Sequence, residues 1–136
     1  MPVPNVLVVE DDDTIRRLLV EYLRSHVELD VESARDGVEA LHLISTKPYR
    51  VVLLDVMMPK MSGVDLLDSL QAFRADPSLQ RMRSSDWPSI IVITSSPEAT
   101  LPAQVFEQRF SGLVCGVFRK PLDIATLADL VMRCLR

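Results

Sequence analysis

Side chains able to do chemistry stand at the ends of four apolar runs in this sequence. Glu10 and Asp11 follow the first run, Asp55 follows the next, and Thr94 and Lys120 follow two more toward the C-terminus. Short apolar runs separated by turn or helix signals are typical of buried parallel strands. Because the carboxyl ends of such strands face one crevice, we expect the three carboxylates, the hydroxyl and the ammonium to converge there.

The chemistry that suits this group is metal-assisted phosphoryl transfer. Crowded carboxylates repel one another and favour a hard cation, whereas an ammonium and a hydroxyl suit the oxygens of an anion. Mg²⁺ takes one or two protein carboxylates, so Asp11 and Asp55 are the expected ligands, with a backbone carbonyl after Asp55, and Glu10 acts through water. Asp55 can then accept a phosphoryl group whose oxygens contact Lys120 and Thr94.

Each of these residues alone has a simpler interpretation. The acidic run at 10–13 suits a helix start, where the helix dipole favours negative charge. Asp55 suits a turn cap, Thr94 an ordinary strand position, and Lys120 a solvated strand end. The functional interpretation is favoured because all four groups occur at the ends of expected strands, in the order acid pair, aspartate, threonine, lysine.

Strand-like runs alternate with helical patterns along the chain. Strands are expected near 5–10, 29–34, 51–55, 89–94 and 114–119, and helices over 15–23, 37–47, 64–75, 100–110 and 124–135. This alternation predicts an α/β fold, a doubly wound five-stranded parallel sheet with helices on both faces. Asp12 or Asp13 is expected to cap the first helix and Asp123 the last. The helix near 100–110 has thin apolar content, and Pro97 and Pro102 limit where it begins.

The length of 136 residues suits a single domain over residues 1–136, with no room for a linked output domain. The polar stretch 76–89 is longer than a minimal turn and is expected to be an inserted surface loop anchored by Trp87. Cys115 and Cys134 have no metal-ligand spacing, and we expect buried or half-buried free thiols.

Composition argues against two classes of partner. The net charge is −4, and no basic stripe is present, so direct nucleic-acid binding is not expected. No apolar run approaches the roughly 20 residues of a membrane span, and no signal peptide opens the chain. The sequence therefore predicts a soluble, cytoplasmic protein without a membrane partner.

Four segments bring these motifs together: Val-Leu-Val-Val-Glu-Asp-Asp at 6–12, Leu-Leu-Asp-Val-Met-Met-Pro-Lys-Met-Ser-Gly at 53–63, Val-Ile-Thr-Ser at 92–95 and Phe-Arg-Lys-Pro-Leu at 118–122. With them, the sequence resembles the response-regulator receiver domains of bacterial-type two-component signalling over nearly its full length. The resemblance implies a sensor histidine kinase or a histidine phosphotransfer protein as the phosphoryl donor, and an unknown output partner. It also implies that the chain catalyses at most its own phosphorylation and dephosphorylation.

The resemblance gives each candidate residue a role. It implies that Asp55 is the phosphoacceptor, that Glu10 and Asp11 form the acid pair, that Met57 offers its backbone carbonyl to Mg²⁺, and that Thr94 and Lys120 sense the phosphoryl group. One departure stands out, because receivers usually carry an aromatic residue three positions before the lysine, where this chain has Val117. Coupling by a rotating ring is therefore not expected.

Three other functions fit the sequence less well. A phosphohydrolase of the haloacid-dehalogenase kind needs Asp-x-Asp-x-Thr, and Glu10 stands where its first aspartate belongs. A dinucleotide-binding domain needs glycines in the first strand-to-helix turn, whereas the glycines here are at 37, 63, 112 and 116. The serious alternative is a receiver-like module that binds proteins without phosphorylation, and the intact set of candidate residues argues against it.

Overall fold

The computed structural model describes residues 5–26, 30–56, 63–76, 87–94, 108–110, 112–119 and 123–134, with the side chains of His26, Thr94 and Arg119 left out. Within these ranges the chain forms β1 (Asn5–Val9), α1 (Asp13–His26), β2 (Asp30–Ala34), α2 (Gly37–Thr46), β3 (Val51–Asp55), α3 (Gly63–Ala75), β4 (Ser89–Thr94), β5 (Val114–Arg119) and α5 (Ile124–Cys134). All five strands lie within one residue of their predicted bounds.

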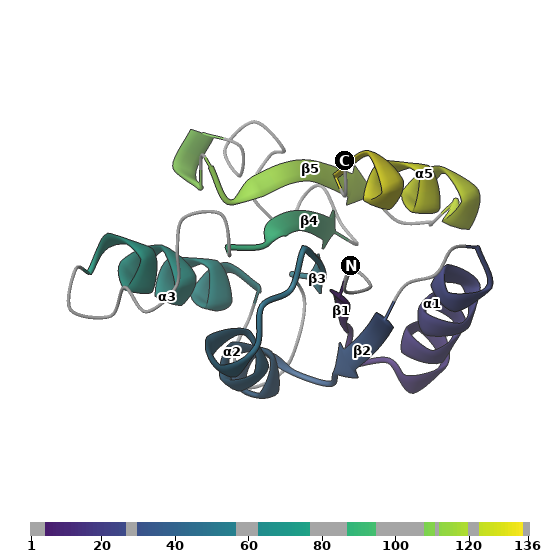
Figure 1. Ribbon diagram of the computed structural model, residues 1–136, viewed down its shortest axis with the longest axis horizontal. Coiled ribbons are helices and arrows are strands. Elements are labelled where there is room, and N and C mark those ends of the chain that lie inside the picture. The colour runs from purple at the N-terminus through teal and green to yellow at the C-terminus, as the bar shows by residue number, and fades with distance from the viewer. Residues whose placement is uncertain are drawn as a thin grey trace.

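The five strands form one parallel sheet in the order β2-β1-β3-β4-β5. The chain starts in β1, adds β2 on one side, and then crosses to add β3 on the other. Helices α2 and α3 cover one face of the sheet and α1 and α5 the opposite face (Figure 1). The predicted doubly wound fold is confirmed, and its topological switch point lies between β1 and β3, where such sheets bind ligands.

Two apolar clusters fill the layers on either side of the sheet. Leu7, Val9 and Leu54 belong to the cluster under α2 and α3, whereas Val6 and Val8 belong to the cluster under α1 and α5. Because both faces are covered, the central strands are apolar at successive positions instead of alternating with polar residues. The continuous runs in the sequence are therefore explained by burial on both faces.

Aspartates cap three of the helices. Asp12 Oδ1 accepts hydrogen bonds from the backbone N–H groups of Thr14 at 2.9 Å and Ile15 at 3.0 Å. Asp123 Oδ2 accepts from the Thr126 hydroxyl at 2.9 Å, and Asp123 Oδ1 accepts from the Thr126 N–H at 3.4 Å. These bonds satisfy N–H groups that have no partner within the helix, and they confirm the predicted caps. Asp36 caps α2 in the same way.

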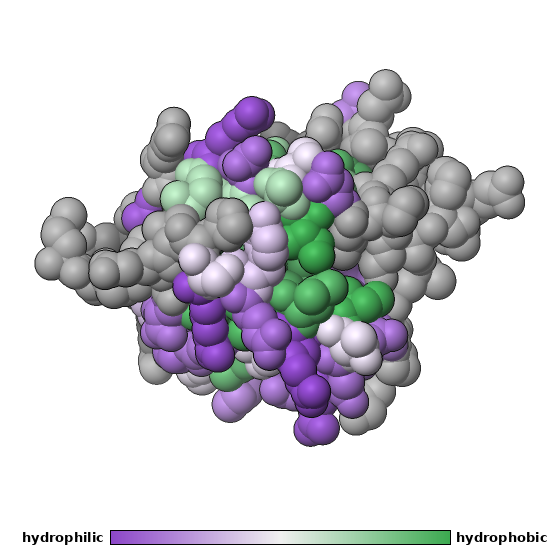
Figure 2. Space-filling model, turned by 90° about the vertical axis from the view of Figure 1, so that its right-hand side faces the viewer, coloured by the Kyte–Doolittle hydropathy of each residue, from purple (hydrophilic) through white to green (hydrophobic). Residues whose placement is uncertain are grey.

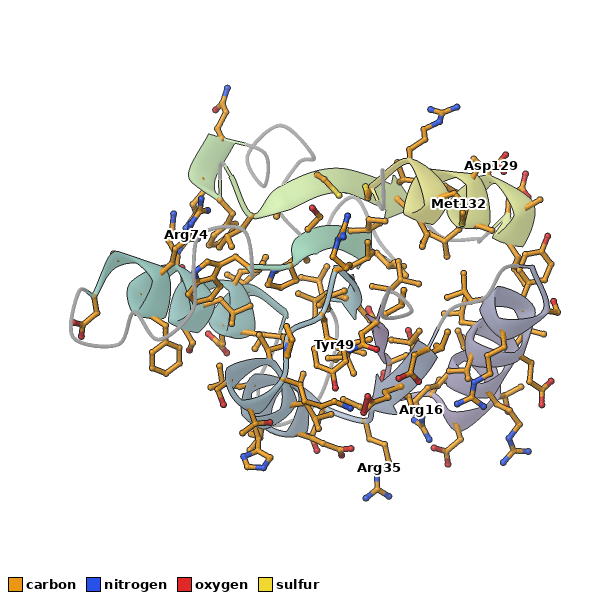
Figure 3. The ribbon with its side chains drawn as sticks, viewed as in Figure 1. Arg16, Arg35, Tyr49, Arg74, Asp129 and Met132 are labelled. Carbon is orange, nitrogen blue, oxygen red and sulfur yellow. The ribbon has the colours of Figure 1, made fainter. Side chains whose placement is uncertain are left out.

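The amino end of β3 is held by a polar cluster beside β2. Tyr49 is buried, and its hydroxyl donates to Glu32 Oε1 at 3.2 Å, while Lys47 forms an ion pair with Glu32. Tyr49 is labelled among the side chains near α2 and β2 in Figure 3. Burial, with the neighbouring Glu32 carboxylate, raises the pKa of Tyr49 to about 12. The phenol therefore stays protonated and keeps donating its hydrogen bond.

Two predicted segments lie largely outside the described residues. Of the helix expected over 100–110, positions 108–109 are helical and 100–107 are not described. Of the expected loop 76–89, positions 77–86 are not described, but Trp87 packs against the core cluster as predicted. In the described part of the chain, no helix is long and apolar enough to cross a membrane.

One prediction about the cysteines is wrong. Cys134 is half-buried as expected, but Cys115 is exposed. Strand β5 is an edge strand, and its pairing with β4 shifts register between Ile90 and Ile91, which leaves Cys115 without a partner position. An extra residue of this kind leaves the regular ladder, so its burial does not follow from the apolar character of the run.

Candidate functional site

Three carboxylates meet at the carboxyl ends of β1 and β3. Val9 pairs with Leu54 in the sheet, so Glu10 and Asp55 are the next residues along two neighbouring strands. One oxygen from each of Glu10, Asp11 and Asp55 lies within 4.8 Å of the others. Glu10 is 1% exposed and Asp55 2% exposed, whereas Asp11 is exposed at the surface. The structure thus brings together the three acids at the switch point of the sheet.

Glu10 is held in place from three sides. Its backbone N–H donates to Ala34 O at 3.1 Å and continues the ladder between β1 and β2. Its carbonyl accepts from Arg16 Nη1 at 2.9 Å, and Arg16 lies between α1 and the sheet (Figure 3). Its carboxylate accepts a longer bond, 3.4 Å, from the Asp12 N–H. Arg16 is a positioning residue that sequence reasoning did not identify, because an arginine on a helix has no distinctive pattern.

The acidic run at 10–13 divides into two pairs of residues with different structural roles. Asp12 caps α1, and Asp13 forms an ion pair with Arg16. The hydrogen bond that Arg16 donates to Asp13, together with the positive charge of Arg16, holds the pKa of Asp13 below its ordinary value. The helix-start interpretation of the run therefore holds for Asp12 and Asp13, and Glu10 and Asp11 remain for the crevice.

The backbone around Asp55 is held by its pairing with β4 and by the close approach of Gly63 at the start of α3. Asp55 pairs with Ile93 of β4, and the next N–H, that of Val56, donates to Ile93 O at 3.0 Å. The N–H of Gly63 donates to Val56 O at 3.0 Å, so the chain returns beside Asp55 where α3 begins. A Cβ at Gly63 would lie 2.6 Å from Val56 Cα and 3.0 Å from Asp55 O. Only glycine permits this approach without a backbone shift.

The remaining candidates are partly or wholly outside the described residues. Thr94 is the last residue of β4, and its backbone pairs with Arg119 in β5. The side chain of Thr94, and all of Met57 and Lys120, are not described. The backbone of Thr94 nevertheless stands at the carboxyl end of the strand next to β3, on the edge where Glu10 and Asp55 lie.

The donor set fits a hard divalent cation. Carboxylate oxygens are the ligands that Mg²⁺ and Ca²⁺ take in proteins, and Mg²⁺ is commonly bound by one or two of them with waters or phosphate oxygens completing its shell. The three acids, two of them buried and one exposed, offer at least that number. Carboxylates gathered this closely repel one another, so a cation has an electrostatic reason to bind here.

Comparison with known proteins identifies the family. The family model described as the response regulator receiver domain matches residues 6–132. The chain belongs to this family. The receiver domain is also 32% identical over 128 residues to the transcriptional regulatory protein SrrA of Staphylococcus aureus, covering 94% of this chain and 47% of SrrA. It thus spans about half the length of the curated relatives that it matches.

Solved structures resemble the receiver domain over almost all of its length. A response regulator receiver protein from Pseudomonas putida is 28% identical with a TM-score of 0.75, and the match covers 98% of both chains. The response regulator TrrA from Thermotoga maritima, solved in complex with Mg²⁺ and BeF, is 23% identical with a TM-score of 0.73, covering 98% of this chain and 100% of TrrA. At that identity the second likeness concerns the fold alone.

Proposed function

We propose that this receiver domain accepts a phosphoryl group on Asp55 from a phosphohistidine of a sensor kinase or a phosphotransfer protein, in a Mg²⁺-dependent reaction. The observation that carries this proposal is the meeting of Asp55 with Glu10 and Asp11 at the switch point of the sheet, with carboxylate oxygens within 4.8 Å of one another. Of these three acids, Asp55 alone ends a strand that is buried at every position. We further propose that residues 1–136 act as one domain.

The proposed cation site consists of Asp11, Asp55 and the backbone carbonyl of Met57, with Glu10 acting through water. When bound, Mg²⁺ supplies positive charge that offsets the negative charge of the phosphoryl oxygens. Glu10 and Asp11 keep the site attractive to that ion, and the strand pairing on both sides of β3 holds the backbone that carries Asp55 in place. Fixed placement of a reacting group lowers the entropic part of the barrier.

In the transfer step, an oxygen of Asp55 attacks the phosphorus of the donor. The phosphorus–nitrogen bond of the phosphohistidine breaks as the new phosphorus–oxygen bond forms, and the departing nitrogen keeps the electron pair and takes up a proton. Lys120 and Thr94 are proposed to contact the transferred phosphoryl oxygens. Such contacts change the conformational equilibrium only where they differ between the two states of the domain.

The output of this domain is proposed to be a change in the surface that a partner protein contacts. Regulation of transcription is named for SrrA, a relative about twice as long as this chain. We propose for the present chain only the receiving part of such a function. Its net charge of −4 does not favour direct contact with nucleic acid.

The decisive experiment is intact-mass measurement after incubation with Mg²⁺ and a small phosphodonor such as acetyl phosphate. The wild-type chain is expected to gain the mass of one phosphoryl group, and Asp55→Asn is expected to gain none. Asp129→Asn is the matched control, because Asp129 is an exposed aspartate on α5 (Figure 3). Full labelling of the Asp55→Asn variant would contradict the assignment.

A further inference from the structure

The two cysteines of the chain lie in contact although they are far apart in the sequence. Cys115 Sγ, in β5, is 2.8 Å from Cys134 Sγ, in the last residue of α5, and both cysteines are free. The chain contains two cysteines in all. Any disulfide within one molecule must therefore join this pair.

An irregularity in β5 places Cys115 beside α5. Ile90 pairs with Val114 and Ile91 with Gly116, so Cys115 is an extra residue in β5, as in a β-bulge. A bulge places two successive residues near the same face of a sheet. Cys115 contacts Cys134, and a Cβ at Gly116 would lie 3.2 Å from Leu130 Cδ2, also on α5. The missing side chain at 116 thus lets the helix approach the strand where the sulfurs meet.

The pair combines contact with accessibility. Cys115 is exposed and Cys134 half-buried, so small reagents in solution reach this part of the surface. A disulfide bond is about 2.0 Å long, so the sulfurs need to approach by roughly 0.8 Å. Cys134 ends its helix, and the last turn of a helix adjusts at low cost because helix ends fray.

We propose that Cys115 and Cys134 form a reversible disulfide that ties the C-terminal end of α5 to β5. The oxidant is a low-molecular-weight disulfide of the glutathione class. One cysteine thiolate attacks the glutathione disulfide, forms a mixed disulfide and releases one glutathione thiolate. The second cysteine gives up its proton and attacks the protein sulfur of the mixed disulfide, which releases the second glutathione. The protein loses two hydrogen atoms, and the glutathione disulfide is reduced to two thiols.

The contact between the two sulfurs affects how readily they ionise. Partial shielding of the Cys115 thiol from water, together with its hydrogen bond to Cys134, raises the pKa of Cys115. Because the thiolate is the reactive form, the first attack is expected to be slow at neutral pH. Whichever thiol attacks first, the other is already in contact with the sulfur that it must attack.

The bond would constrain the junction between β5 and α5. The closed loop runs from Cys115 to Cys134 and contains the end of β5, the connection at 120–122 and the whole of α5. Such a cross-link stabilises the folded state mainly by restricting the unfolded chain. Oxidation is therefore expected to raise the Tm of the domain by several degrees and to slow hydrogen exchange at the end of α5.

The test is non-reducing intact-mass analysis of the full chain equilibrated with mixtures of reduced glutathione and glutathione disulfide. The wild type is expected to lose the mass of two hydrogen atoms, to stay monomeric, and to return to the starting mass when reduced glutathione is added. Cys115→Ser and Cys134→Ser are each expected to carry one glutathione. Asp55→Asn is expected to oxidise like the wild type, so this outcome is independent of phosphoryl transfer.

A measurement in urea shows whether the fold brings the thiols together. The quantity to compare is the ratio of the closed disulfide to the mixed disulfides. This ratio should be at least about tenfold higher in the native protein than in urea, because the fold raises the effective concentration of one thiol at the other. An equal ratio in both conditions would overturn the proposal. So would a wild-type chain that carries glutathione on both cysteines, forms covalent dimers, or stays reduced while the single variants react.

Discussion

The junctions between β1 and α1 and between β5 and α5 are built alike and differ in their surroundings. Helices α1 and α5 pack against the same apolar cluster, and each begins at an aspartate cap. Figure 2 looks onto the side of the molecule that carries both helices and shows some hydrophobic surface between hydrophilic side chains. Strand β1, however, is flanked by strands on both sides, whereas among the described strands β5 has only β4 as a neighbour.

This difference in surroundings matches a difference in chemistry. The four valines and leucines of β1 are buried, while the described side chains of β5 are half-buried or exposed. The buried acids of the proposed site, Glu10 and Asp55, stand at the ends of central strands. Groups that can change their bonding, Cys115 and Cys134, occur at the edge. Fewer buried contacts mean a lower cost of local opening, which suits an element that adjusts.

Removing one carboxylate from the central junction should have the largest effect. Asp11→Asn is expected to weaken Mg²⁺ binding at least tenfold and to abolish labelling by acetyl phosphate at low millimolar Mg²⁺. Asp13→Asn is the matched control, because Asp13 lies in the same acidic run but pairs with Arg16. Affinity for Mg²⁺ should also fall as the pH falls, because protons compete for the carboxylates. Calorimetric titration measures both effects, and equal affinities of the two variants would contradict the proposed site.

Two glycine substitutions compare the packing beside Asp55, at Gly63, with the packing of the edge strand β5, at Gly116. Gly63→Ala places a Cβ 2.6 Å from Val56 Cα, whereas Gly116→Ala places one 3.2 Å from Leu130 Cδ2. Overpacking costs about 1–3 kcal/mol, and we expect Gly63→Ala at the upper end because a backbone atom must move. Gly116→Ala should cost less, because the end of Leu130 can turn away. Urea unfolding measures both, and the reverse order would show that the edge is the stiffer region.

Hydrogen exchange with and without beryllofluoride locates the segment that responds to a phosphoryl-like ligand. Since Val117 replaces the usual ring, we expect the signal to pass through Thr94 and the segment that follows it. Exchange should therefore change most across residues 94–112, by about tenfold, which corresponds to about 1.4 kcal/mol. If the largest change falls instead in residues 76–89, that insertion is the output element.

Two of the helix caps, Asp12 and Asp123, should show the smallest effects. Asp12→Ala removes an acceptor for two N–H groups and is expected to cost about 1 kcal/mol. Asp123→Ala should cost less, because its bond to the Thr126 N–H is longer. The hydrogen bonds from Thr126 lower the pKa of Asp123, so its contribution is complete above the unfolded-state pKa, near 3.9, and is lost as the pH falls through the lower folded-state pKa. Thermal unfolding between pH 2 and pH 6 of each alanine variant, set beside the wild type, checks this order.

Local patterns predicted much of this molecule. The strand bounds, the doubly wound sheet and the caps at Asp12 and Asp123 followed from apolar runs and from residues next to them. The closeness of Glu10 and Asp55 followed from their positions after neighbouring strands. These features depend on short stretches of sequence and on one general rule of parallel sheets.

Features that depend on exact contacts between distant segments could not be predicted. Position 63 requires glycine because the start of α3 approaches Val56 closely, and not because Gly63 has a positive φ. The exposure of Cys115 comes from a register shift relative to β4. The contact of Cys115 with Cys134 depends on this shift and also on the packing of α5 against β5. An apolar run reveals a strand but not where its ladder is interrupted.

The strand order also has a consequence for folding kinetics. Glu10 and Asp55 become neighbours only when β3 pairs with β1, and that pairing encloses α1, β2 and α2 in one large loop. Closing such a loop is slow, and the acids of the proposed cation site do not come together until it is closed. A bound cation therefore gains its contacts late and should lengthen the lifetime of the native state more than it shortens the time needed to fold.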